Sequence, residues 1–123
     1  MERPAVFDEE LLDPPCHAAI IGVRDGGVFF SNPSHPYARR NLTLRYRPWA
    51  DEATGEEHTV GGWRAALTLE EGYASYSALT WLSSRRAVGC LYEARENARA
   101  IIKFVAIPLS AASGRGYALH SHC

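Results

Sequence analysis

The chain has 123 residues, of which 46% are hydrophobic and 22% are charged, and its formal net charge is −1. This composition is typical of one small globular domain and argues against disorder. The balanced charge gives no basic excess of the kind that follows nucleic-acid phosphates, so no nucleic-acid partner is expected. No apolar run approaches the roughly 20 residues of a membrane helix, and no transmembrane segment is expected.

Short runs rich in apolar, β-branched and aromatic residues, separated by turn residues, predict an all-β fold. Leu42, Leu44 and Tyr46 alternate with polar residues, which is the period of two of a half-buried strand. Residues 36–39 and 69–73 are each expected to hold a helical turn. We expect seven strands, over residues 16–23, 28–31, 41–47, 64–69, 75–82, 87–92 and 100–109.

The segments outside the strands have distinct compositions. Residues 48–62 are polar and rich in glutamate, which predicts a long exposed loop within a hairpin. Residues 1–109 are expected to form the β domain and residues 110–123 a flexible tail. Asp13 and Asp25 lie in or beside predicted turns and are interpreted as turn formers.

The number of strands bears on completeness. Seven strands amount to nearly two four-stranded blades of a β-propeller, and an open blade leaves unpaired backbone groups at its edges. We therefore expect this chain to form only part of such a fold. The first ten residues are acidic and lack an apolar core, so no signal peptide is expected in this chain.

Three cysteines, Cys16, Cys90 and Cys123, form no close pair and show no metal-ligand spacing. Cys16 and Cys90 are interpreted as buried free thiols. His120, His122 and Cys123 leave open an alternative interpretation as a small metal-binding protein, although the set offers only three ligands. The main interpretation includes no metal and no cofactor.

Three segments occur in the order and at the spacing found near the end of a sialidase catalytic domain. They are FFSNPSHP at residues 29–36 with RRNLTLR at 39–45, GYASYSAL at 72–79, and GCLYE at 89–93. Together with FDEELLDPP at residues 7–15, they resemble the animal lysosomal type of this family over about residues 5–109. The resemblance implies a six-bladed β-propeller, of which this chain would supply the C-terminal blades. The family's Asp-box turn is degenerate here, since only Trp63 remains of it.

The resemblance also implies an activity and the residues that carry it. Members of the family are exo-α-sialidases, which hydrolyse terminal sialic acids from glycoproteins, glycolipids and oligosaccharides. Tyr76 matches the nucleophile, and Arg39 matches the third of three arginines that bind the substrate carboxylate. Arg40 remains the alternative to Arg39, because neighbouring strand residues point to opposite faces. Glu93 matches the glutamate that orients the first arginine of the triad.

A tyrosine nucleophile suits this substrate, because the anomeric carbon of sialic acid bears a carboxylate that would repel an attacking carboxylate. No residue of this chain matches the general acid, the base that activates the tyrosine, or the first two arginines. A phenol with an ordinary pKa of about 10 is a poor nucleophile without a base. The chain on its own is therefore expected to be inactive.

The resemblance implies a cellular setting as well. The substrate would be a sialylated glycoconjugate, the location the lysosome, and the partners the missing N-terminal part of the propeller and a protective serine carboxypeptidase. The sequon at Asn41, Asn-Leu-Thr, is a glycosylation candidate. The tail, with Tyr117 and His120, lacks a tyrosine-based sorting signal. The alternative function is a non-catalytic propeller remnant that binds partners through its strand edges.

Overall fold

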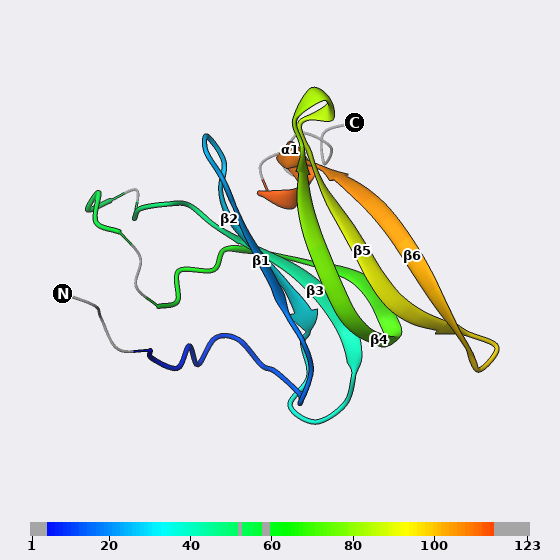
Figure 1. Ribbon diagram of the computed structural model, residues 1–123. Helices are drawn as coiled ribbons and strands as arrows, with labels where there is room; N and C mark the ends of the chain where they lie inside the picture. Colours follow the sequence, from blue (N-terminus) through cyan, green and yellow to red (C-terminus); the bar gives the residue numbers. More distant parts are fainter. Residues whose placement is uncertain (1–4, 52, 58–59, 115–123) are drawn as a thin grey trace, which may run out of the picture.

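The computed structural model describes residues 5–51, 53–57 and 60–114. Six strands form one antiparallel sheet in the order β1-β2-β3-β4-β5-β6, and Figure 1 shows that this sheet is strongly curled. The predicted all-β fold is confirmed. The elements are β1 Ala19–Val23, β2 Gly27–Pro33, β3 Arg40–Arg47, β4 Ala65–Leu82, a 3-10 turn Ser83–Arg85, β5 Ala87–Glu96, β6 Arg99–Pro108 and α1 Leu109–Ala112.

β4 is a single 18-residue strand that belongs to both halves of the sheet. Its first part pairs with β3 as far as Tyr73, and its second part pairs with β5 from Ala74 onward. The prediction of two strands, 64–69 and 75–82, joined by a helical turn was wrong. The reason is that β3 extends back to Arg40, which pairs with Tyr73, and this ladder keeps residues 69–73 extended through two register shifts.

The helical turn expected at residues 36–39 is also absent, since these residues form a bend. The side chain of His35 explains the bend, because its Nδ1 accepts hydrogen bonds from the backbone N–H groups of Tyr37 and Ala38 at 3.0 and 2.8 Å. A side-chain acceptor that captures nearby N–H groups competes with helical hydrogen bonds.

The core lies on the inner side of the curl, where the two halves of the sheet face each other. Phe29, Leu42 and Leu44 from the first half are fully buried, as is Val88 from the second half. A buried hydrogen bond of 2.8 Å between the hydroxyl oxygens of Ser31 and Ser77 joins β2 to β4 across this interface. Large apolar side chains and a satisfied polar pair therefore hold the halves together.

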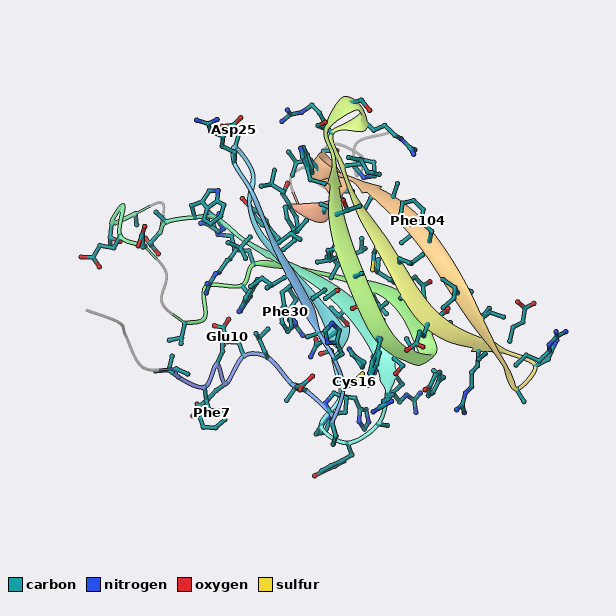
Figure 2. All side chains as sticks on the ribbon, viewed as in Figure 1. Phe7, Glu10, Cys16, Asp25, Phe30 and Phe104 are labelled. Carbon is teal, nitrogen blue, oxygen red and sulfur yellow. The ribbon has the colours of Figure 1, made fainter. Side chains whose placement is uncertain are left out.

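The chain before β1 runs along the first half of the sheet (Figure 2). Asp8 accepts hydrogen bonds from the Gly61 N–H and from Trp63 Nε1, at 2.8 and 3.0 Å. Burial acts to raise the pKa of Asp8, but these hydrogen bonds outweigh it and the pKa lies below its usual value. Asn32 donates to the Leu12 carbonyl at 2.7 Å. These contacts fix the path of the segment that leads to residues 15–17.

Several smaller predictions have clear outcomes. The described residues between β3 and β4, namely 48–51, 53–57 and 60–64, form a loop, in agreement with the loop predicted at 48–62. Asp25 lies in the β1–β2 turn. Asp13 instead accepts a hydrogen bond of 3.1 Å from Asn32 Nδ2. Cys90 is a buried free thiol, whereas Cys16 is free and only partly buried.

The end of the chain contains one short helix. Ala112 of α1 is buried in the core, although the sequence predicts a flexible tail over residues 110–123. Cys123 and the histidines of the metal-binding alternative, His120 and His122, lie outside the described residues. Within the described residues, no helix is long and apolar enough to cross a membrane.

Removing the Phe29 ring tests where the core lies. Phe29→Ala is expected to lower the free energy of unfolding by about 3–5 kcal/mol, because it leaves a cavity at a site with no exposed surface. Urea denaturation followed by circular dichroism measures the change. The matched control is Phe7→Ala, since Phe7 is 96% exposed and its truncation should change stability by no more than about 0.5 kcal/mol. Equal losses in the two variants would contradict the described core.

The Cys90 thiol makes the free energy of unfolding depend on pH in the alkaline range. Burial raises the pKa of Cys90 to about 11, against an ordinary 9.0, so the folded chain keeps the thiol proton that the unfolded chain releases. The contribution of the protonated thiol to stability is complete below about pH 9. It is lost as the pH rises toward about 11, and the free energy of unfolding falls by roughly 2–3 kcal/mol over this range. Urea midpoints at pH 8 and 10.5 should fall less in Cys90→Ala than in the parent chain. Equal falls of the urea midpoint in the two proteins would show that the Cys90 thiol does not cause the pH dependence.

Candidate functional site

The three residues that the resemblance assigns to the active site lie together at one end of the curled sheet. Arg39 belongs to the bend before β3, Tyr76 to the second part of β4, and Glu93 to β5. Cys16, just before β1, is at the same end, and Figure 2 labels it opposite Asp25. Residues from four separate segments therefore converge here.

A β-bulge sets the direction of Tyr76. Ala74 pairs with Ala94 and Ser77 pairs with Tyr92, so Ser75 and Tyr76 together stand opposite Glu93 alone. A bulge of this kind re-aims a side chain and leaves a backbone group without its ladder partner. The Tyr76 N–H donates instead to Glu93 Oε1 at 3.1 Å. The Tyr76 side chain is 49% exposed while Ser75 and Ser77 beside it are buried.

The Arg39 guanidinium lies beside the Tyr76 ring, with its central carbon 5.6 Å from the ring centre. Nε and Nη2 donate to the Pro15 carbonyl at 3.2 and 2.8 Å, and Nη1 donates to Ser75 Oγ at 3.2 Å. The backbone is held too, since the Arg39 carbonyl accepts from the Ala74 N–H at 3.1 Å. A hydrogen bond with Tyr73 raises the pKa of Arg39. The result is an oriented, permanent positive charge next to an exposed phenol.

The side chains of Arg39 and Arg40 lie in different places on the surface. Arg40 begins β3 and pairs with Tyr73, and its side chain lines a separate polar hollow together with Arg45 and Glu71. Within the described residues, Arg39 is the arginine in contact with the Tyr76 ring. Which of the two binds a substrate carboxylate stays a prediction.

Sequence reasoning missed His17. Its ring centre lies 5.5 Å from that of Tyr76, with the ring planes at 57°. Next to it, Cys16 Sγ is 3.7 Å from Ser75 Oγ. No pattern marked His17, because it stands alone before the first strand and reaches Tyr76 only through the fold. His17 and Tyr76 border a shallow hollow of about 260 Å³, whose lining also includes Leu91, Tyr92, Glu93 and Ile102.

The other two predicted residues occupy defined surroundings. The described contact of Glu93 is with the Tyr76 N–H, and its expected role toward an arginine stays a prediction. Asn41 is half-buried, with φ at +57°, and its carbonyl accepts from the Ser34 N–H and the Thr43 hydroxyl, both at 2.9 Å. Its glycosylation also stays a prediction.

A larger hollow of about 440 Å³ lies at the end of the sheet near Asp25, lined in part by Tyr46, Arg85 and Ser113. It contains none of the predicted site residues. Size alone does not mark a catalytic site. The smaller hollow is the stronger candidate, because the Tyr76 phenol and the Glu93 carboxylate line it and the Arg39 guanidinium lies beside the Tyr76 ring.

No family model matches the chain. Within residues 5–51, 53–57 and 60–114, no group of three or more histidine, cysteine or carboxylate side chains is placed to hold a metal ion. The contacts described above define a candidate site that consists of Tyr76, Arg39, Glu93 and His17. Its chemistry is that of a fixed cation, which suits an anionic ligand, beside a phenol exposed to that ligand.

The bulge can be tested through the amide of Tyr76. Glu93→Ala removes the acceptor of the Tyr76 N–H and is expected to lower the free energy of unfolding by about 1 kcal/mol. Exchange of the Tyr76 amide proton, followed by NMR, should become faster. Glu93→Gln keeps an acceptor, so its exchange rate should lie between those of the parent chain and Glu93→Ala. Glu96→Ala, on the same strand, should leave the exchange rate of the Tyr76 amide unchanged. Unaltered exchange in Glu93→Ala would exclude the proposed contact.

Proposed function

We propose that the chain is the C-terminal part of an exo-α-sialidase of the animal lysosomal type, in which Tyr76 is the nucleophile. The observation that carries the proposal is the meeting of Arg39, Tyr76 and Glu93. Each belongs to a different sialidase-like segment, and they come into contact through the fold, with the Arg39 guanidinium 5.6 Å from the Tyr76 ring centre.

The shape of the sheet supports an incomplete propeller. The sheet ends at β1 on one side and β6 on the other, and no described strand pairs with either outer edge. The outer face of β6 exposes Ile102 and Phe104, by 63% and 54%, and Leu91 of β5 lies exposed beside them. Exposed apolar strand faces of this kind usually meet another layer of protein. In the proposed enzyme, another blade of the propeller packs against Phe104, whereas Leu91 and Ile102 remain in the lining of the hollow beside Tyr76.

In the proposed mechanism, Arg39 binds the carboxylate of a terminal sialic acid and brings the anomeric carbon to Tyr76. The phenol oxygen attacks that carbon, the glycosidic bond breaks, and water later hydrolyses the sialyl–tyrosine bond. Glu93 holds the Tyr76 backbone at the bulge and would orient a second arginine. The base that takes the phenol proton, the acid that protonates the leaving oxygen and two further arginines come from the rest of the propeller.

The same resemblance supplies the remaining parts of the proposal. The substrates are sialylated glycoproteins, glycolipids and oligosaccharides, the location is the lysosome, and a protective serine carboxypeptidase is the partner. Asn41 carries a glycan there. No metal and no cofactor takes part.

Fusing this chain to the upstream blades of an animal lysosomal sialidase tests the proposal. The fusion is expected to hydrolyse a fluorogenic sialoside, whereas the chain alone should not exceed the buffer rate, because it lacks the acid and the base. Tyr76→Phe should reduce turnover by about a thousandfold or more, since the nucleophile is lost. The matched control is Tyr37→Phe, because Tyr37 is an 84% exposed tyrosine outside the site. A fusion that melts cooperatively but is inactive, or one that tolerates Tyr76→Phe, would contradict the proposal.

The two adjacent arginines provide a second test in the same fusion. Arg39→Lys is expected to raise KM by about tenfold or more, because an ammonium group does not replace a two-pronged guanidinium–carboxylate contact. Arg40→Lys should leave KM within about twofold. The opposite ranking would assign carboxylate binding to Arg40.

A further inference from the structure

Ser75 is a buried residue of β4 whose hydroxyl contacts the Arg39 guanidinium. The bulge brings it there, because Ala74 and Ser75 are both buried and the alternation of the strand shifts by one residue before Tyr76. Ser75 is only 2% exposed, so its hydroxyl does not meet a ligand directly. Any part that it plays in the site therefore passes through the residues it touches.

The Arg39 guanidinium is held at more than one point. Nε and Nη2 both donate to a single atom, the Pro15 carbonyl oxygen, and contacts to one atom let the group pivot about it. Nη1, the nitrogen that this oxygen does not contact, donates to Ser75 Oγ at 3.2 Å. Tyr73 also hydrogen-bonds to Arg39, but its side chain is only partly buried. Ser75 is thus the buried side-chain acceptor that fixes the plane of the guanidinium.

The position of the Ser75 hydroxyl is itself fixed by its neighbours. A guanidinium can only donate, so Ser75 Oγ is the acceptor in its bond with Arg39. The same oxygen lies 3.7 Å from Cys16 Sγ, in a contact where either atom can be the donor. The Ala74 N–H beside it donates to the Arg39 carbonyl at 3.1 Å. The segment before β1, the bend before β3 and the bulge of β4 therefore meet around this hydroxyl.

The partner of Ser75 distinguishes it from a serine that only stabilises the fold. Ser31 is fully buried, and its hydroxyl bonds to that of Ser77 between two packed strands. Arg39, in contrast, is exposed and lies 5.6 Å from the centre of the Tyr76 ring. The direction in which its remaining N–H groups point decides how a carboxylate would sit beside Tyr76.

We propose that Ser75 is a positioning residue of the site, which orients the Arg39 guanidinium for the substrate carboxylate. This inference rests on the proposed function, since it assigns Ser75 a part in binding the sialoside. Loss of the hydroxyl leaves Arg39 free to turn, so substrate binding weakens. The chemical step is kept, because Tyr76 and its hydrogen bond to Glu93 are unchanged.

The first test needs only this chain. NMR exchange measurements on the Arg39 guanidinium, identified by the loss of its signals in Arg39→Lys, give the rate of rotation about the Nε–Cζ bond. Ser75→Ala is expected to speed this rotation several-fold, because the bond from Nη1 is lost. Ser31→Ala is the matched control, since it also removes one buried hydroxyl but does not touch Arg39. It should leave the rotation unchanged.

The second test uses the fusion to upstream sialidase blades and a fluorogenic sialoside. Ser75→Ala is expected to raise KM about fivefold and to leave kcat within about twofold, whereas Ser31→Ala should leave both within about twofold. In the Arg39→Lys background, Ser75→Ala should change KM by less than about twofold, because the group that it orients is already gone.

The outcomes separate this inference from the proposed function. An active fusion in which Ser75→Ala and Ser31→Ala raise KM equally would overturn the positioning role and leave the sialidase proposal standing. An unchanged rotation rate in Ser75→Ala, or a full fivefold effect of Ser75→Ala in the Arg39→Lys background, would also overturn the role. An inactive fusion would contradict the proposed function, and with it any part of Ser75 in binding a sialoside.

Discussion

The packing of the two halves of the sheet against each other depends on β4. This strand pairs with β3 along its first part and with β5 along its second part, so it carries the chain from one half to the other without a loop. The curl lets Phe29, Leu42 and Leu44 meet Val88 and Cys90 in one core. The buried Ser31–Ser77 hydrogen bond adds a directional contact to this apolar contact. Without the change of partner along β4, neither half would have a face to bury.

The candidate site also depends on β4. The bulge at Ser75 and Tyr76 lies just after the change of partner, and it turns the Tyr76 ring outward while Ser75 stays buried against Arg39. The segment before β1 completes the arrangement, since the Pro15 carbonyl holds the Arg39 guanidinium. The bulge leaves both Ala74 and Ser75 buried, so the alternation shifts by one residue and Tyr76 falls on the exposed side.

Much of the fold could be predicted from the sequence, because alternation and turn residues are local signals. The strands around Leu42–Tyr46 and residues 87–92, the loop at 48–62 and the turn at Asp25 follow from such signals. The continuity of β4 could not be predicted, because residues 69–73 were expected to hold a helical turn and only pairing with β3 keeps them extended. The bend at His35 depends on which atom captures two N–H groups, which composition does not reveal.

The candidate site shows the same difference between local sequence signals and long-range contacts. The resemblance to sialidases points to Tyr76, Arg39 and Glu93, and their proximity is a property of the fold that periodicity alone does not contain. His17 carries no sequence signal, since it matters only through what lies beside it in space. A contact between distant segments can be found only once the register of the strands is known.

The identity of the nucleophile is the central claim, and a covalent trap tests it most directly. A fluorinated sialosyl donor that forms a long-lived adduct would be incubated with the fusion of this chain to upstream sialidase blades, followed by proteolysis and mass spectrometry. The account predicts one sialyl group on Tyr76, and none on Tyr73 or Tyr92 nearby. An adduct on another residue, or hydrolysis without any adduct on Tyr76, would contradict it.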